Sequence, residues 1–206
     1  MEEGLDNETE VTFVKESPEV DGLVQQIKDA LEEGDPPADG TSTPIAKTVF
    51  HKIQEIVERY QEYPTLLDQH LERWILPLTS VIRREAYRGS EADMVLVQRA
   101  SRALHALASV RGYKTVVKFF PHEAKDFEPV VGLLVRSHDV GSLATNMEEA
   151  DELGSAWETR ATLILWLSIL VLIPFDLVTV DSQVTTNTGD DGADLVQGVG
   201  LGHVVS

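Results

Sequence analysis

The stretch WETRATLILWLSILVLIPFDL, residues 157–177, decides the expected fold. From residue 161 to residue 175 it contains only two polar side chains, Thr162 and Ser168. Pro174 is expected to end the helix, because proline cannot continue the backbone hydrogen-bond ladder. The helix should therefore have about 17 residues and a length of about 26 Å. A helix that is apolar on nearly all sides must be enclosed by other protein or by lipid.

The ends of this stretch favour protein over lipid as its surroundings. A membrane-spanning helix needs about 20 apolar residues, and a shorter run is more typical of a buried core helix. Glu158, Arg160 and Asp176 bound the apolar run closely. Ser155 and Glu158 also have the spacing of a capping box, which begins a helix at this point. We expect a buried helix with no membrane span; a membrane anchor over residues 161–175 is the alternative.

The acidic charge lies mainly at the two ends of the chain, whose formal net charge is −18. Residues 1–40 carry 13 acidic and 2 basic side chains, and residues 181–206 carry 4 acidic and no basic ones. Residues 41–180 are nearly balanced, with 18 acidic and 15 basic side chains. Acidic ends repel nucleic acid and the middle has no concentrated basic stripe, so nucleic acid is not an expected partner.

The polar segments divide the chain into three expected parts. Residues 1–42 are interpreted as a disordered acidic leader, with one weak amphipathic segment at residues 20–31. Residues 43–180 are expected to form a helical-repeat region, interrupted by a polar surface loop at 138–154. Residues 181–206 are rich in glycine and lack an apolar period, so they are interpreted as a disordered tail.

Apolar spacing in the middle part predicts a series of helices. Side chains at helical spacing predict helices over residues 44–63, 68–88, 90–112 and 126–137, and no stretch has the pattern of a strand. Asp68 is expected to cap the second of these helices and Pro77 to kink it. Two helix starts, Pro44 and Glu91, are separated by about the 40–47 residues of a HEAT or armadillo repeat. The predicted fold is all-α, an incomplete HEAT/armadillo-like α-solenoid, in which neighbouring repeats cover an apolar interior helix.

No motif in the sequence predicts catalysis, a cofactor or a metal. His122 and Glu123 begin a zinc-protease pattern, but that pattern needs a second histidine at position 126, which is Asp126. The chain has no cysteine, which excludes disulfides and cysteine-ligated zinc. It also lacks a phosphate-binding loop ending in Lys-Ser or Lys-Thr and a Gly-x-Ser-x-Gly motif. We therefore expect a protein that is not an enzyme. The N-terminus lacks a signal-peptide pattern, which favours the cytoplasm.

Three stretches together resemble one family, tubulin-folding cofactor D. They are residues 60–82, 110–134 and 157–177, and their most specific words are VRGYKT, FPHE, WETR and LIPFD, in that order. The resemblance implies a cytosolic HEAT/armadillo solenoid that takes β-tubulin after the chaperonin step. The resemblance also implies that such a protein acts together with cofactors C and E and an Arf-like small GTPase to assemble or dismantle the αβ-tubulin dimer. Association with microtubules and centrosomes is a further implication.

The same resemblance implies that the cofactor complex stimulates GTP hydrolysis by tubulin, while the chain itself is no hydrolase. This sequence departs from the family in two respects: family members are far longer, and the segment after Leu177 does not resemble a further repeat. A terminal repeat needs a polar capping face, so the apolar run at 157–177 predicts that the isolated chain self-associates or folds only partly. The alternative function is a generic helical-repeat adaptor that is not specific to tubulin.

The candidate partner-binding residues lie at the end of the predicted third helix and in the turn after it. They are Arg111, Tyr113, Lys114, Lys118, His122 and Glu123. Solenoids often present partner contacts at such turns, and a modest basic cluster suits acidic tubulin. The alternative interpretation is that the basic side chains only stabilise the helix dipole at a C-terminus.

Overall fold

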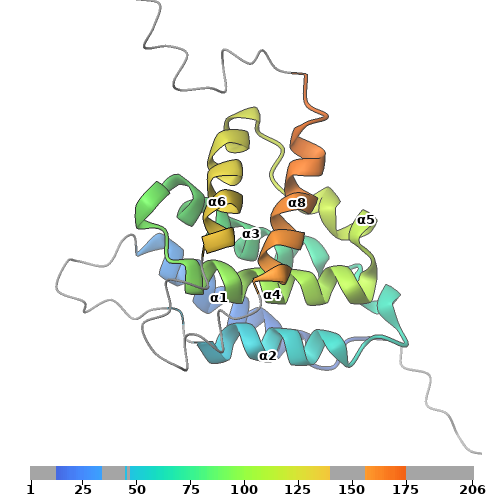
Figure 1. Ribbon diagram of the computed structural model, residues 1–206. Helices are drawn as coiled ribbons and strands as arrows, with labels where there is room; N and C mark the ends of the chain where they lie inside the picture. The colour runs from blue at the N-terminus through green and yellow to red at the C-terminus, as the bar shows by residue number, and fades with distance from the viewer. Residues whose placement is uncertain (1–12, 34–44, 46, 140–155, 175–206) are drawn as a thin grey trace, which may run out of the picture.

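The computed structural model describes residues 13–33, 45, 47–139 and 156–174, and this part of the chain consists of helices and short connections, with no strand (Figure 1). The α-helices are α1 (Ser17–Glu32), α2 (Lys47–Glu58), α3 (Leu71–Tyr87), α4 (Met94–Arg111), α5 (Tyr113–Val116), α6 (Phe127–Asp139) and α8 (Trp157–Leu170). Short 3-10 turns connect them: η1 (Pro64–Leu67), η2 (Gly89–Glu91), η3 (Val117–Phe119) and η4 (Ala124–Asp126). The predicted all-α class is confirmed.

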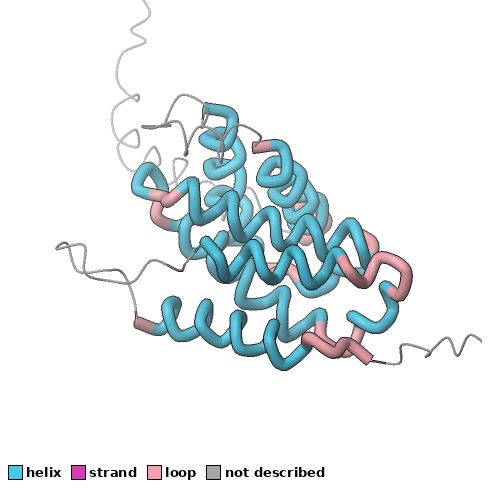
Figure 2. Tube along the Cα trace, turned by 90° about the horizontal axis from the view of Figure 1, so that it is seen from below, coloured by secondary structure: helices cyan, strands magenta, loops and turns pink. Residues whose placement is uncertain are grey.

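Helix α4 lies at the centre of the described part. It packs against α2, α3, α5 and α8, and α1 packs against α2 and α3 (Figure 2). Helices α6 and α8 pack against each other and stand across α4 at a steep angle (Figure 1). The arrangement is a stack of helices in which each new helix covers the ones before it.

The predicted apolar stripes form the core. In α2 the side chains from Val49 to Val57 at helical spacing are all buried, and in α3 those of Trp74, Ile75 and Leu78 have no exposed surface. The stripe of α4 is buried at Val97, Ala100, Leu104 and Leu107 and partly buried at its two ends. Fully burying one large apolar side chain stabilises the fold by about 1.5–3 kcal/mol. The periodicity of the sequence therefore identified most of the core correctly.

The helix ends agree with the sequence in part. Asp93 caps α4, because its carboxylate accepts a hydrogen bond of 3.0 Å from the Leu96 amide. Gly112 ends α4 with φ 96°, a conformation that side chains disfavour. Asp68 was the wrong cap for α3, which begins after His70 without a side-chain cap; Asp68 binds Arg111 instead.

Four further expectations are not settled by the structure. Helix α3 runs unbroken through Pro77, so the kink at this residue stays a prediction. Ser155 of the expected capping box, the start at Thr43-Pro44 and the loop at 140–154 lie outside the described residues.

For residues 17–32 the prediction of a disordered leader is wrong, because they form α1 and bury Val20, Leu23, Val24 and Ile27. Two of the acidic side chains in α1 are paired with other helices. Asp21 accepts a hydrogen bond of 2.8 Å from the Trp74 indole, and an ion pair joins Glu19 to α2. The exposed side chains of α1 are mostly polar and include Glu19, Gln25 and Asp29. The other limits of the three-part division stay a prediction.

His70, at the start of α3, is expected to make stability depend on pH. Its buried ring stacks on Trp74 at 4.9 Å, and its Nδ1 lies 3.1 Å from the Arg73 guanidinium. Burial, followed by the Arg73 charge, lowers the pKa of His70 below 6.5, and Asp21 opposes this only in part. The unfolded chain therefore binds more protons than the folded chain below that pH.

The free energy of unfolding should consequently fall as the pH is lowered from about 7.5 to about 5.5. Urea denaturation at the two pH values measures this change. His70→Gln should reduce the difference, whereas an equal difference in the variant would assign the effect to another group. The carboxylates of Glu16 and Asp68, whose pKa values are lowered by Tyr60 and Arg111, act at lower pH.

Helix α8 is buried on one side only, contrary to the expectation that its whole circumference is enclosed. Its inner side chains, such as Leu163, Trp166 and Leu170, have no exposed surface. Its opposite side exposes large apolar side chains: Trp157, Ile164, Val171 and Leu172. Within the described ranges, no helix has the length and hydropathy needed to cross a bilayer.

Candidate partner-binding surface

The turn that carries the candidate residues is held at both ends. Gly112 changes the chain direction between α4 and α5, and the Thr115 amide bonds to its carbonyl at 3.0 Å. At the far end Phe120 is buried and meets Trp166 edge-to-face, with 6.0 Å between the ring centroids. The Trp166 indole also donates a hydrogen bond of 2.9 Å to the carbonyl of Pro121. Residues between these anchors are thus presented on a fixed backbone.

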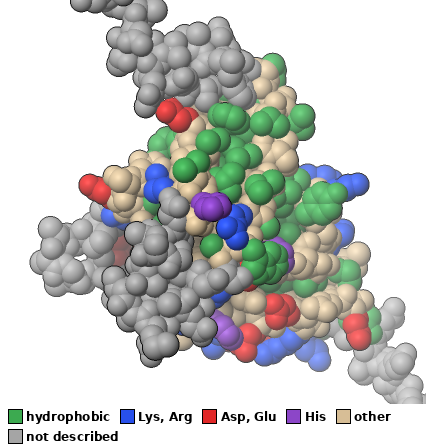
Figure 3. All heavy atoms as spheres, viewed as in Figure 1, with side chains coloured by type: hydrophobic (Ala, Val, Ile, Leu, Met, Phe, Trp, Pro, Cys, Tyr) green, Lys and Arg blue, Asp and Glu red, His purple; other side chains and the backbone are tan. Residues whose placement is uncertain are grey.

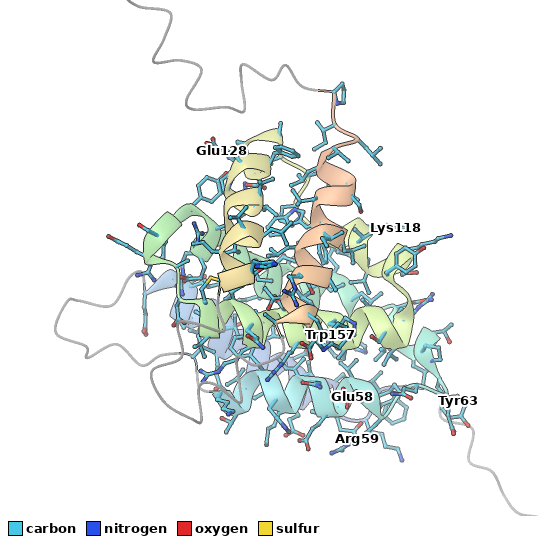
Figure 4. All side chains as sticks on the ribbon, viewed as in Figure 1. Glu58, Arg59, Tyr63, Lys118, Glu128 and Trp157 are labelled. Carbon is cyan, nitrogen blue, oxygen red and sulfur yellow. The ribbon has the colours of Figure 1, made fainter. Side chains whose placement is uncertain are left out.

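Five of the six predicted residues face solvent. They are Tyr113, Lys114, Lys118, His122 and Glu123, and Lys118 points outward from the turn (Figure 4). Within the described part of the chain, neither lysine forms an ion pair. These two lysines and Tyr113 are available to a partner, and we call them the α5 surface.

Arg111 has a structural role that spacing alone did not reveal. Its guanidinium binds both carboxylate oxygens of Asp68, with 2.8 Å between Nη2 and Oδ2. This bidentate contact lowers the pKa of Asp68 and joins the end of α4 to the segment before α3. A planar guanidinium is well suited to such a pair. Arg111 therefore helps to hold the turn, and we do not assign it to the α5 surface.

Glu123 also belongs to the support of the turn. Its carboxylate lies 2.7 Å from Arg83 and 2.6 Å from Lys125. Lys125, followed by Arg83, lowers the pKa of Glu123. The carboxylate is thereby committed to contacts inside the chain, and the same arginine links it to a buried group.

Asp126 is that buried group, with no exposed surface. One of its oxygens accepts hydrogen bonds from the Arg83 guanidinium at 2.9 Å and from the Tyr87 hydroxyl at 2.8 Å. Desolvation and the bond to Asp126 raise the pKa of Tyr87 to about 12, so the hydroxyl remains a donor at neutral pH. This cluster fastens the η4 turn to α3 and thereby fixes the backbone after Pro121.

A groove beside Tyr113 was not predicted from the sequence. It has a volume of about 570 Å³ and lies between α4, α5 and α8. Its walls are almost entirely apolar and include Leu104, His105, Tyr113, Phe120, Ile164 and Leu165. Figure 3 shows hydrophobic side chains gathered on this side of the molecule. Helices α4 and α5 are consecutive, but α8 begins about 40 residues after α5, so the sequence alone does not show that the three helices meet.

The next feature is whether the described residues form a metal site. Among them, no group of three or more histidine, aspartate or glutamate side chains is placed to hold a metal ion. His122, which begins the incomplete zinc-protease pattern, is exposed. The arrangement offers apolar area, two lysines and a tyrosine, which are the materials of a protein-binding surface.

Comparison with known proteins identifies the family. A family model described as tubulin-specific chaperone D-like, ARM repeat, matches residues 57–199. The chain belongs to this family. The resemblance inferred from the sequence is therefore confirmed, and the predicted armadillo-like α-solenoid agrees with the repeat type of the family.

A curated relative extends this result. Tubulin-specific chaperone D of Dictyostelium discoideum is 26% identical to this chain over an alignment that is 242 residues long. The alignment covers 83% of this chain but only 15% of the relative. The chain thus spans less than a sixth of the length of that relative. No solved structure matches the chain.

Proposed function

We propose that the chain is a tubulin-binding chaperone module of the cofactor D type. It acts by binding β-tubulin in the post-chaperonin folding and αβ-dimer assembly pathway, and it is not itself an enzyme. The observation that carries the proposal is the family match over residues 57–199. The name of the Dictyostelium relative, a tubulin-specific chaperone, supports tubulin as the partner.

The wider pathway is part of the same proposal. It includes cofactors C and E and an Arf-like small GTPase as further partners, stimulation of GTP hydrolysis as a property of the assembled complex, and a cytoplasmic site of action. These points rest on the resemblance of residues 60–82, 110–134 and 157–177 to the family. They concern a protein much longer than this chain.

Within the chain, the α5 surface is the proposed contact for tubulin. Lys114 and Lys118 are exposed beside Tyr113, on a backbone that Gly112 and Trp166 hold in place. Tyrosine is enriched in protein interfaces because it has apolar area and a polar end. Exposed lysines attract an acidic partner over a distance and accelerate association.

Charge reversal of the two lysines is expected to weaken tubulin binding by about tenfold at low salt, mainly through slower association. The variant is Lys114→Glu with Lys118→Glu, and surface plasmon resonance with purified tubulin measures both rate constants. Arg111 is left unchanged because its loss would disturb the turn.

The matched control is Lys15→Glu with Lys28→Glu, which makes the same charge change on and beside α1. Equal weakening in both variants would reduce the effect to net charge and remove α5 as the contact. If the unaltered chain fails to bind tubulin while a longer family member binds it, this chain lacks the tubulin site. Failure of both would favour the generic helical-repeat adaptor.

A further inference from the structure

The first turn of α8 borders a second, smaller pocket. This pocket has a volume of about 240 Å³ and lies between the start of α8, the second half of α4 and the end of α2. Trp157 and Glu158, the first two residues of the WETR word, both line it. Neither residue belongs to the α5 surface, so the pocket is a separate candidate for binding.

Trp157 brings an aromatic ring to the pocket that remains open to solvent. The side chain is 47% exposed, and its ring meets His105 edge-to-face with 4.6 Å between the centroids. The other two tryptophans of the chain are fully buried, and their indole N–H groups are hydrogen-bonded. Figure 4 shows Trp157 at the lower end of α8 and Glu58 below it on α2. The face of a partly exposed tryptophan is a good place for a cation to stack.

Glu58 gives the pocket a negative charge. It is the last residue of α2, where the free carbonyl groups of the helix end are also partly negative. Its carboxylate accepts a hydrogen bond of 2.8 Å from Gln54, and within the described ranges it forms no ion pair. The next residue, Arg59, is directed to Glu16 and does not line the pocket.

Glu158 is a second carboxylate in the lining, and it lacks a hydrogen-bond donor. Its side chain is only 17% exposed, and its Oε1 lies 3.8 Å from Nε of Arg102, which is too far for a hydrogen bond. The other oxygen, Oε2, is buried without a partner, although such groups are normally hydrogen-bonded. The two carboxylates, of Glu58 and Glu158, and the guanidinium of Arg102 leave one negative charge in the lining.

The shape of the lining favours a guanidinium over other cations. A guanidinium is planar and has five N–H donors, so it can stack on an indole and donate to a carboxylate at the same time. A lysine ammonium is a point charge without a flat face. A metal ion fits less well, because among the described residues no three histidine or acidic side chains are placed to hold one.

We propose that this pocket binds an arginine side chain of a partner protein, with its guanidinium stacked on Trp157 and hydrogen-bonded to Glu58. The charge of Glu158 adds to the attraction. This inference goes beyond the proposed function, because the α5 surface presents lysines to an acidic partner, whereas the pocket takes a basic group. It does not require tubulin to be the partner.

The test titrates the full chain with a blocked glycine-arginine-glycine peptide and with the same peptide carrying citrulline in place of arginine. Citrulline keeps the length and planarity of the arginine side chain but has no charge. Two-dimensional NMR measures affinity through the indole N–H of Trp157 and the side-chain amides of Gln54 and Gln61, which line the pocket. The arginine peptide should bind at least about tenfold more tightly than the citrulline peptide.

Variants place the peptide in the pocket. Glu58→Gln should weaken binding of the arginine peptide at least about fivefold. Glu62→Gln, which removes the same charge from an exposed side chain outside the pocket, should leave binding unchanged. Trp157→Ala should also weaken binding at least about fivefold, whereas Phe13→Ala, at another exposed aromatic side chain, should not. Circular dichroism checks the folding of each variant, and the two glutamate variants keep the test decisive if Trp157→Ala unfolds.

Several results would overturn the proposal. Absence of saturable binding, equal affinity for the arginine and citrulline peptides, or equal weakening by Glu58→Gln and Glu62→Gln would each do so. A lysine peptide that binds as tightly as the arginine peptide would overturn the choice of arginine. Lys114→Glu with Lys118→Glu should leave peptide binding unchanged. Failure of the pocket and failure of the α5 surface as the tubulin contact are therefore distinguishable.

Discussion

Replacing Trp166 with alanine is expected to lower the free energy of unfolding by about 3–5 kcal/mol, the usual cost of removing a fully buried tryptophan. Trp166 has no exposed surface and stands at the junction between α8 and the turn after α5. Its ring meets Phe120 edge-to-face at 6.0 Å. The surrounding helices cannot close the resulting cavity fully, because they are also packed on each other.

The loss should extend beyond packing. The Trp166 indole donates to the Pro121 carbonyl, and alanine leaves that carbonyl without its partner, which adds a cost of about 1 kcal/mol or more. The backbone between Gly112 and Pro121 also loses one of its two anchors. We therefore expect faster hydrogen exchange at the α5 surface as well as lower overall stability.

Trp157→Ala is the matched control, since it removes the same side chain from the same helix. Trp157 is 47% exposed and contacts His105 edge-to-face, so its loss should change stability by about 1 kcal/mol or less. Chemical denaturation followed by circular dichroism compares the two variants. If both lose the same free energy, α8 is not anchored through its inner face and the described packing is wrong.

Most of the core followed from periodicity, because the relevant information is local. A stripe such as that of α2 can be read from 12 residues of sequence, and the partner helix need not be known. The predicted helix over residues 90–112 ends where α4 ends, before Gly112, but it begins too early, because Asp93 is the residue that caps α4.

Contacts between distant segments could not be read in this way. Arg111 and Asp68 are 43 residues apart, and only the folded chain shows that they form a pair. Helix α1 was missed for a related reason: the acidic composition of the whole leader outweighed the apolar period of residues 20–31. Its acids are stable in a folded structure because Trp74 and Arg73 bind Asp21.

For the candidate surface, the sequence predicted which side chains are exposed but not which contacts they form. The exposure of the two lysines and Tyr113 was expected from their place after a helix end, whereas the pair that Glu123 forms with Arg83 was not. The groove needed three helices in their final positions. For α8, composition predicted burial on all sides, but composition does not reveal on which side neighbours are present.

Removal of the Arg83 charge should have the second large effect. Arg83→Met keeps much of the side-chain volume but leaves the Asp126 carboxylate, which has no exposed surface, with only the Tyr87 hydroxyl. An uncompensated buried charge of this kind typically costs about 3–5 kcal/mol. The free energy of unfolding, measured by urea denaturation, should fall by that amount. Arg73→Met is the control, because its pair with Asp21 is half exposed and should contribute about 1 kcal/mol or less.

A second substitution, at Asp126, separates the contribution of the Arg83–Asp126 ion pair to stability from the contribution of side-chain packing. In Arg83→Met with Asp126→Leu the buried charge is gone as well, and replacement of both members of a buried pair is often nearly neutral. We expect the double variant to recover at least about half of the lost stability. If it is instead less stable than Arg83→Met, the Asp126 carboxylate stabilises the η4 turn without Arg83. The bond from Tyr87, rather than the ion pair, would then be the contact that fastens the turn to α3.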